Sequence, residues 1–331
     1  MTEQFDIPGM SVGVVGLGLM GSSIVVSLLL AGHRVIGIAP ITGEKEKALS
    51  HIKDQLKICE KDGLLMKSCD SYLLDLIISD DYKELNDCSL VLECVLEEVE
   101  IKKSVYRNIV SSVHPDAIIG SNTSAVPITV LQQYVTCPER FIGIHWAEPA
   151  FATRFMEIIC GSQTSVQTAE WVSKLAHYWG KEPTVLKKDI RGFIANRLMY
   201  AVYREALHLV EEGQATLEDA DKVFRYDVGS WITLMGIFRR MDSLGLSDYS
   251  VIFKNILPQL SNENEVPPLM QHLVDINACG IRNGKGLYNY TEEEAKNWEK
   301  AFASFSRDIY QLALLYPSKP IDVLCKELNI E

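Results

Sequence analysis

A histidine and a glutamate lie in two apolar runs of the chain that are joined by a short loop. His145 follows the run of residues 141–144, and Glu157 lies within the run of residues 155–159. Continuous apolar runs of this length are typical of buried strands in a parallel sheet. The loop between them contains Pro149, which can extend neither a helix nor a central strand. The two runs are therefore expected to form neighbouring strands.

Neighbouring strands would bring the imidazole and the carboxylate together, and such a pair could transfer a proton. A carboxylate that holds one ring nitrogen fixes the tautomer and frees the other nitrogen as a general base. On this interpretation His145 is the base and Glu157 orients it. The alternative is that His145 only packs or caps at a strand end. The pair by itself does not separate these two interpretations.

A glycine-rich turn near the start of the chain follows a short apolar strand. The run Gly16-Leu-Gly18-Leu19-Met20-Gly21 has the form G-x-G-x-x-G, and it is followed by a helical pattern over residues 22–31 and a strand pattern over 33–38. This context is typical of a dinucleotide-binding turn, in which backbone N–H groups at the helix start face the pyrophosphate. We therefore expect these residues to bind a nicotinamide dinucleotide. The alternative is a glycine-rich turn without a ligand.

The end of the second predicted strand departs from that pattern. An Asp or Glu is expected there to bind the ribose hydroxyls of NAD, but the sequence has Ala39 followed by Pro40. No arginine stands beside it to bind a ribose phosphate, although Lys45 and Lys47 are near in the sequence. NAD is the expected cofactor, and the choice between NAD and NADP stays open.

Alternating strand and helix patterns continue to about residue 187. Further strands are predicted at residues 76–79, 89–94, 117–121 and 183–187, and helices at 43–63, 97–112 and 165–179. From residue 192 onward the pattern is helical. The alternation predicts an α/β fold with a doubly wound parallel sheet of the Rossmann type, followed by an all-α C-terminal domain. The predicted domains are residues 1–189, which bind the dinucleotide, and residues 190–331, which bind substrate and dimerise.

Composition limits the classes of function. The chain has 331 residues, of which 47% are hydrophobic, and a formal net charge of −12, which argues against general nucleic-acid binding. The eight cysteines form no C-x-x-C pair, so neither a zinc site nor a disulfide framework is predicted. The first ten residues lack the apolar core of a signal peptide, and no apolar run near them is long enough to span a bilayer. A cytoplasmic location without membrane attachment is expected.

Several motifs taken together resemble the 3-hydroxyacyl-CoA dehydrogenase family over nearly the whole chain. They are Ser121-Asn-Thr-Ser124 after a predicted strand, His145 21 residues after Ser124, Glu157 12 residues after His145, Glu97 with Lys102 five residues on, Gly192-Phe-Ile-Ala-Asn196-Arg at the start of the helical domain, and Gly284-Lys-Gly286-Leu-Tyr288. Each motif alone is of moderate specificity. Their common order and spacing make the resemblance strong.

The resemblance implies roles for individual residues. His145 would accept the hydroxyl proton while a hydride leaves the adjacent carbon for the nicotinamide, and Glu157 would orient His145. Ser124 and Asn196 would hydrogen-bond the reacting substrate. Ser124 could instead cap the helix that follows it, and Asn196 could serve a hydrogen bond between helices.

The resemblance also implies the cofactor, the substrate class and the assembly. Glu97, Lys102 and Asn122 would lie near the nicotinamide half of NAD. The partner would be a small hydroxyacyl or hydroxyacid substrate, with a place in fatty acid metabolism. The family further implies a homodimer.

Three departures from the family bear on the substrate more than on the reaction. Glu148 stands where the family has Asn before Pro, the family's Gly-Pro-Phe reads Gly236-Ile237-Phe238, and residues 50–62 show no clear set of side chains that would hold CoA. Relatives that oxidise carnitine or sugar acids have a stretch similar to residues 192–213 and need no CoA. A carnitine or sugar-acid dehydrogenase is therefore the alternative enzyme.

Two further rivals remain. The glycine turn is also similar to that of short-chain β-hydroxyacid dehydrogenases, but the stretch where those carry a catalytic lysine has Asn196 instead. A protein that has lost catalysis, as the lens crystallins of this superfamily have, is the other. Ala39 supports that interpretation, whereas four residues oppose it: Ser124, His145, Glu157 and Asn196.

Overall fold

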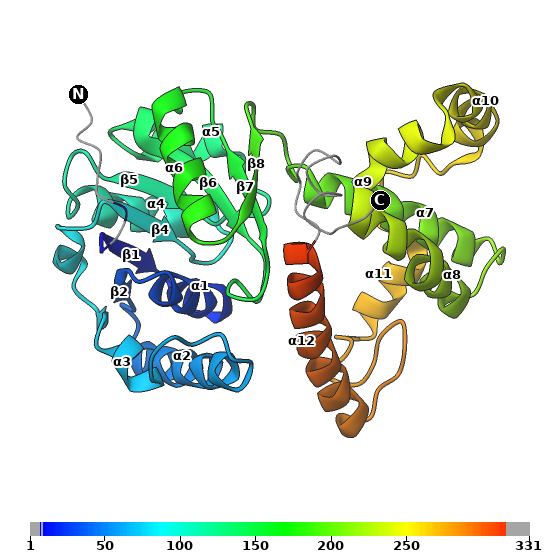
Figure 1. Cartoon of the computed structure of the whole chain (residues 1–331). Helices are drawn as coiled ribbons and strands as arrows, with labels where there is room; N and C mark the ends of the chain where they lie inside the picture. Colours follow the sequence, from blue (N-terminus) through cyan, green and yellow to red (C-terminus); the bar gives the residue numbers. More distant parts are fainter. Residues whose placement is uncertain (1–6, 8, 316–331) are drawn as a thin grey trace. The chain divides into compact units, whose positions relative to one another are not determined.

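The computed structural model describes residue 7 and residues 9–315. The chain divides into two compact units, Met1–Ala195 and Asn196–Glu331 (Figure 1). The domain boundary at residues 189/190 stays a prediction, and the predicted helical pattern after residue 315 lies outside the described residues. Within the described part, none of the helices combines the length and the apolar character that crossing a membrane requires.

The first unit is built on one sheet of eight strands. They are β1 (Ser11–Val15), β2 (Arg34–Ile38), β3 (Leu76–Ser79), β4 (Leu90–Glu93), β5 (Ile118–Ser121), β6 (Phe141–Trp146), β7 (Phe155–Ile159) and β8 (Glu182–Leu186). Their order across the sheet is β3-β2-β1-β4-β5-β6-β7-β8. Order reverses between β1 and β4, which is the arrangement of a doubly wound Rossmann sheet. The predicted fold class is confirmed.

One pair of strands departs from the expected parallel arrangement. Strands β6 and β7 pair antiparallel, whereas all the other neighbours are parallel. The connection between them consists only of residues 147–154, and a parallel crossover needs a dozen residues or more. The antiparallel register places His145 directly opposite Glu157.

Helices cover both faces of the sheet (Figure 1). They are α1 (Leu19–Leu30), α2 (Glu44–Lys61), α3 (Cys69–Leu73), α4 (Val99–Val110), α5 (Ile128–Leu131) and α6 (Val166–Tyr178). Successive strand residues alternate between two apolar clusters, since Leu90 and Leu92 belong to one and Val91 to the other. Helices α1, α2 and α6 pack in the first cluster, and α4 and α5 pack in the second.

The described part of the second unit is built of helices joined by turns and loops. It contains α7 (Ala195–Glu211, whose first residue still belongs to the first unit), α8 (Leu217–Val223), a π-helical turn (Phe224–Val228), α9 (Gly229–Leu244), α10 (Leu246–Ile256), α11 (Pro268–Asp275) and α12 (Glu292–Leu315). Strand pairing in these residues is limited to one isolated bridge, between Gly280 and Lys285. This agrees with the predicted all-α C-terminal domain.

The glycine turn between β1 and α1 depends on close backbone approach. Gly16 has a φ of 89°, which is in the left-handed region that favours glycine, and its N–H donates to the carbonyl of Ile38 at 3.1 Å. A Cβ added to Gly21 would overlap the carbonyl oxygen of Gly16. Helix α1 begins at Leu19, earlier than the sequence pattern suggested, so Gly21 lies within its first turn.

We expect Gly21→Ala to destabilise the first unit, whereas Gly18→Ala should not. The new methyl group at residue 21 meets backbone that cannot move aside, and overpacking of this kind costs about 1–3 kcal/mol. A Cβ at Gly18 would meet no atom within 4 Å, and its φ of −66° suits alanine. Thermal unfolding of both variants checks this, and an equal loss of stability in the two would contradict it.

Candidate active site

The structure brings His145 on β6 and Glu157 on β7 together. The imidazole Nδ1 lies 2.8 Å from Oε2 of Glu157, whose side chain is 1% exposed. The other carboxylate oxygen accepts the backbone N–H groups of Ile194 at 2.9 Å and Ala195 at 3.0 Å. Glu157 is therefore held by donors on both oxygens, and it holds His145 in turn.

These contacts fix the charge on Glu157 and the tautomer of His145. Burial alone would raise the pKa of Glu157, but the hydrogen bonds from His145 and from the two backbone N–H groups lower it below its ordinary value. An ionised carboxylate can only accept hydrogen bonds. Nδ1 of His145 therefore carries a proton, and in the neutral imidazole Nε2 presents a lone pair.

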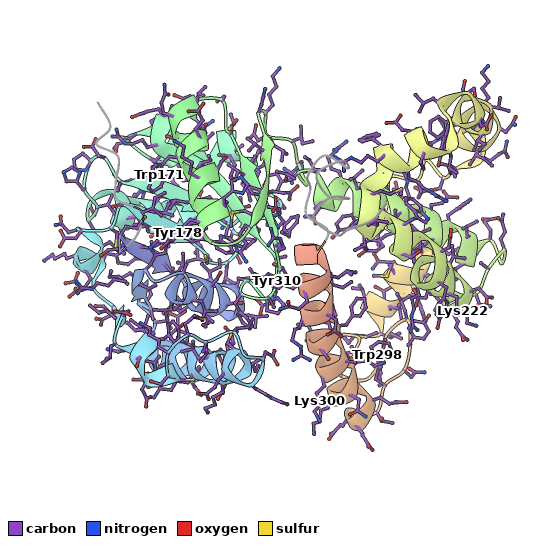
Figure 2. All side chains as sticks on the ribbon, viewed as in Figure 1. Trp171, Tyr178, Lys222, Trp298, Lys300 and Tyr310 are labelled. Atoms are coloured by element: carbon purple, nitrogen blue, oxygen red, sulfur yellow. The ribbon has the colours of Figure 1, made fainter. Side chains whose placement is uncertain are left out.

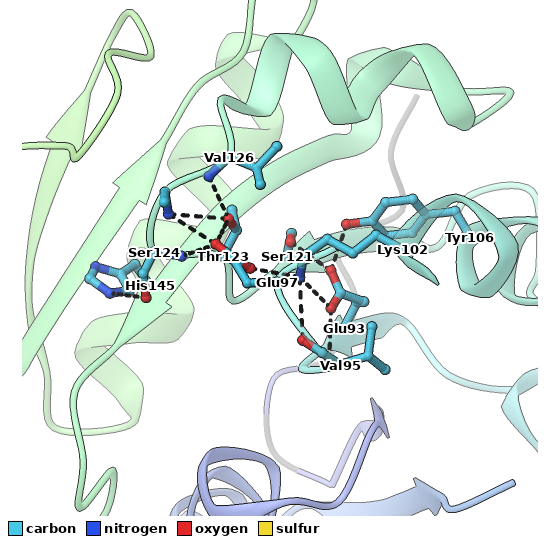
Figure 3. Close-up of polar contacts among 11 residues, drawn as sticks. Glu93, Val95, Glu97, Lys102, Tyr106, Ser121, Thr123, Ser124, Val126 and His145 are labelled. Carbon is cyan, nitrogen blue, oxygen red and sulfur yellow. Dashed lines mark hydrogen bonds and ion pairs between the residues drawn. The ribbon is translucent and has the colours of Figure 1, made fainter. Parts of the chain in front are cut away.

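Ser124 lies beside that lone pair. Its Oγ is 3.1 Å from Nε2 of His145 (Figure 3). The serine belongs to the turn that follows β5, and β5 is the parallel neighbour of β6. The ends of β5 and β6, together with Glu157 on β7, thus place a hydroxyl, an imidazole and a carboxylate in one row, from Ser124 through His145 to Glu157.

Glu97 holds the same turn, and Lys102 holds Glu97 (Figure 3). Oε1 of Glu97 accepts the N–H groups of Ser124 at 2.8 Å and Ala125 at 2.9 Å, and the hydroxyl of Thr123. Nζ of Lys102 lies 3.1 Å from Oε2 of Glu97, and the lysine side chain is 1% exposed. Glu97 is 38% exposed, so of the two it is the side chain that a ligand could reach.

The other two predicted polar residues differ in position. Oδ1 of Asn122 accepts the backbone N–H of Trp146 at 2.9 Å, so its amide joins the ends of β5 and β6. Asn196 lies in the first turn of α7 and belongs to the second unit. Its approach to His145 stays a prediction.

The glycine turn fits a dinucleotide pyrophosphate. The N–H groups in the first turn of a helix have no partners within that helix, and Leu19 and Met20 supply two of them at the start of α1. The space beside Gly18 is open, so that a phosphate can approach the backbone. The turn lies outside the carboxyl ends of the strands, where the strand order reverses and nucleotides bind in such sheets.

The ribose position has no polar side chain on β2. Ala39 follows the strand, is 3% exposed and donates its N–H to the carbonyl of Ser79. A methyl group cannot bind ribose hydroxyls. The structure thus fits the phosphate half of the cofactor better than it fits the ribose contact.

The sequence analysis did not identify Glu93, which is fully buried at the end of β4. Its carboxylate lies 2.8 Å from Nζ of Lys102. The available signal was a charged residue closing an apolar strand, with a lysine nine residues later in the next helix. Buried charges are rare unless they are paired, so this pattern indicates that Lys102 is the partner of Glu93.

Glu148 lies in the loop after β6 and is held in a poorly solvated position. Its carboxylate hydrogen-bonds with Ser23 of α1, but its Oε2 is buried with no hydrogen-bond partner among the described residues. Burial raises the pKa of Glu148 to about 7, against a smaller lowering by Ser23. The neutral carboxyl resembles the amide of the asparagine that the family resemblance places here.

Two family models match consecutive parts of the chain. The model described as "3-hydroxyacyl-CoA dehydrogenase, NAD binding domain" matches residues 11–190. The model described as "3-hydroxyacyl-CoA dehydrogenase, C-terminal domain" matches residues 192–290. Together they match residues 11–290 apart from residue 191.

Among curated proteins, the chain is 32% identical to 5-formyl-3-hydroxy-2-methylpyridine 4-carboxylate 5-dehydrogenase of Mesorhizobium japonicum, over 86% of this chain and 92% of that one. It is 35% identical to an L-carnitine dehydrogenase of Oceanobacillus iheyensis, over 69% and 73%. It is 30% identical to a probable 3-hydroxybutyryl-CoA dehydrogenase of Deinococcus radiodurans, over 85% and 100%.

Two solved structures are similar over most of their length. The crystal structure of a 5-formyl-3-hydroxy-2-methylpyridine 4-carboxylic acid 5-dehydrogenase, described as an NAD⁺-dependent dismutase, has a TM-score of 0.85 at 30% identity, covering 94% of this chain and all of that one. The (S)-3-hydroxybutyryl-CoA dehydrogenase of Ralstonia eutropha has a TM-score of 0.71 at 27% identity, covering 85% and 99%.

Glu148 is expected to make stability fall as pH rises from about 4.5 to 7. Its pKa is higher in the folded state, so the folded state binds more protons in that window and loses stability as they leave. With the effect reduced for solvent screening of this partly exposed group, Glu148→Gln should therefore gain about 1–2 kcal/mol relative to the parent between pH 5 and pH 8.

The measurement is thermal or urea unfolding at both pH values. Glu100→Gln is the matched control, because the side chain of Glu100 is 81% exposed. A Glu148→Gln variant whose stability relative to the parent does not change with pH would show that burial does not hold the proton on Glu148.

Proposed function

Because the chain belongs to the 3-hydroxyacyl-CoA dehydrogenase family, we propose that it interconverts a 3-hydroxy and a 3-keto group with a nicotinamide cofactor. The observation that carries this proposal is the row from Ser124 through His145 to Glu157, at the end of β6. That end lies on the same edge of the sheet as the glycine turn, because β1, β4, β5 and β6 are parallel.

In this proposal His145 is the general base. Its Nε2 accepts the proton of the substrate hydroxyl in the oxidative direction and returns it in reduction. Glu157 keeps Nδ1 protonated and stabilises the imidazolium that forms. The buried carboxylate lies 2.8 Å from Nδ1, so its fixed negative charge stabilises the positive charge that forms on the ring.

Two further side chains would hold the substrate. Ser124 already lies 3.1 Å from Nε2, so its hydroxyl can bind the same oxygen that exchanges a proton with His145. Asn196 would supply a second hydrogen bond from the helical domain. Fixing the reacting atoms in this way contributes to the rate by proximity.

The cofactor is proposed to be NAD. Gly16, Gly18, Leu19, Met20 and Gly21 would hold its pyrophosphate, and Glu97 and Asn122 would lie near the nicotinamide with Lys102 behind Glu97. When bound, the cofactor supplies or accepts the hydride. Since Ala39 offers neither a carboxylate nor a positive charge, NADP is the competing cofactor, and fluorescence titration with NADH and NADPH decides between them.

The proposed substrate is a 3-hydroxyacyl-CoA or a related hydroxy carboxylate. A dehydrogenase of carnitine or a sugar acid is the second candidate, because one relative at 35% identity is named L-carnitine dehydrogenase. Another relative is named for a pyridine carboxylate. Hydroxyacyl-CoAs, L-carnitine, sugar acids and that pyridine carboxylate therefore form the test panel, with turnover followed by NAD(P)H absorbance. Saturable cofactor binding without turnover of any of them would contradict the proposed reaction.

We propose that a second copy of the chain covers the helical unit. Large apolar side chains are exposed on its helices and turns, among them Tyr226 at 74%, Phe238 at 78% and, on α12 (Figure 2), Trp298 at 54%. None of the described hydrophobic residues after 195 is buried. Exposed apolar area on this scale marks an interface. In this proposal residues 1–189 bind the cofactor, and residues 190–331 bind substrate and form the dimer.

His145→Ala is expected to lower kcat by about a hundred- to ten-thousand-fold, the usual contribution of a positioned base. The affinity for NADH should stay nearly unchanged, because the pyrophosphate turn is not altered. Steady-state kinetics and NADH fluorescence measure the two quantities. His114→Ala is the matched control, since His114 is 64% exposed, and full activity in the His145 variant would remove this residue from the mechanism.

Sedimentation of the full chain is expected to give the mass of a homodimer. Phe238→Glu would place a charge on the exposed apolar surface and should shift the protein toward the monomer. Leu74→Glu is a control on the first unit, where Leu74 is 85% exposed. A wild-type protein that sediments as a monomer at micromolar concentration would contradict the proposed assembly.

A further inference from the structure

A fully buried carboxylate closes strand β4 (Figure 3). Oε1 of Glu93 accepts the backbone N–H of Val95 and Nζ of Lys102, both at 2.8 Å. Its Oε2 accepts the hydroxyl of Tyr106 at 2.6 Å and that of Ser121 at 2.7 Å. Four donors, one from the loop after β4, two from α4 and one from β5, therefore hold this side chain in one orientation.

The ammonium of Lys102 joins this carboxylate to a second one. Nζ lies 2.8 Å from Glu93 and 3.1 Å from Glu97. Burial lowers the pKa of Lys102, but the two carboxylates raise it, so that the pKa is raised overall and the group stays charged. A buried ion pair often contributes less to stability than apolar side chains of the same volume. Stability alone is therefore a weak reason for this arrangement.

The second carboxylate carries a turn. Oε1 of Glu97 accepts the N–H groups of Ser124 and Ala125 and the hydroxyl of Thr123, while Lys102 holds Oε2. The backbone of Ser124 is thus held by Glu97, and Glu97 is held in turn by Lys102. Glu97 is 38% exposed, but Lys102, which holds its other oxygen, is 1% exposed.

We propose that Glu93 is a positioning residue that acts on Ser124 from a distance. It holds Lys102 in contact with Glu97. Glu97 then holds the turn that places Ser124 Oγ 3.1 Å from Nε2 of His145. This inference rests on the proposed function, because it assigns Ser124 to the reaction. A displacement of about 1 Å at such a group costs on the order of a hundredfold in rate.

A double-mutant cycle on the full-length protein tests this. Glu93→Gln keeps the shape of the side chain and removes its charge, and it should lower kcat by about tenfold or more. In the Ser124→Ala background the same substitution should cost no more than about twofold, the usual error of additivity. An equal loss in both backgrounds would mean that Glu93 acts independently of Ser124, which would overturn the proposal.

Ile109→Val is the matched control. Ile109 is fully buried on α4 but has no polar group with which to join the series of contacts from Glu93 to Ser124. We expect it to cost about 0.5–1.5 kcal/mol of stability while kcat changes by no more than about twofold. If Ile109→Val lowered kcat as much as Glu93→Gln does, lost stability rather than positioning would explain the effect.

A second readout needs no substrate. The NMR signals of the His145 ring should shift in Glu93→Gln in the same direction as in Ser124→Ala, with no further shift in the double variant. Unchanged His145 signals in Glu93→Gln would overturn the positioning role. A wild-type protein that turns over no substrate would instead contradict the proposed function, while this spectroscopic test would still decide the present inference.

Discussion

The carboxylate of Glu157 is the group on which the site depends. It is almost fully buried in a mainly apolar sheet, and it persists there as an anion because each of its oxygens receives donors. Burial of an ionised group without such donors would cost several kcal/mol. The donor on one side is the ring of His145, and the donors on the other are the N–H groups of Ile194 and Ala195 at the start of α7. One side chain thereby fixes the proton on the imidazole and anchors the start of the helical segment that carries Asn196.

The same principle recurs at Glu93. Both carboxylates belong to apolar strands, and both oxygens of each accept hydrogen bonds. Each carboxylate therefore has a fixed position and fixes the position of another side chain. Glu157 does so directly for His145, and Glu93 does so through Lys102 and Glu97. Glu157 holds His145, and the contacts that begin at Glu93 hold the turn of Ser124. The distance between the Ser124 hydroxyl and the imidazole therefore depends on side chains buried in the sheet.

Much of the fold could be predicted because its signals are local. The glycine turn, the apolar strands and the helical pattern after residue 192 each follow from residues within a few positions of one another. The antiparallel pairing of β6 and β7 was not predicted, since an apolar run is the same in either direction. Glu93 was not identified because only Lys102 gives a nearby signal in the sequence, whereas the donors Tyr106 and Ser121 lie 13 and 28 residues away.

The sequence by itself determined which residues are available for chemistry, and in which order, because motif spacing is written along the chain. It also determined the phosphate turn, since glycine at residues 16 and 21 is a local steric requirement. Only the tertiary structure decided which oxygen of Glu157 faces which nitrogen of His145. It also decided that Lys102 contacts Glu97. Those outcomes depend on burial and on donors from distant strands, and burial is a property that a residue acquires only when the sheet has formed around it.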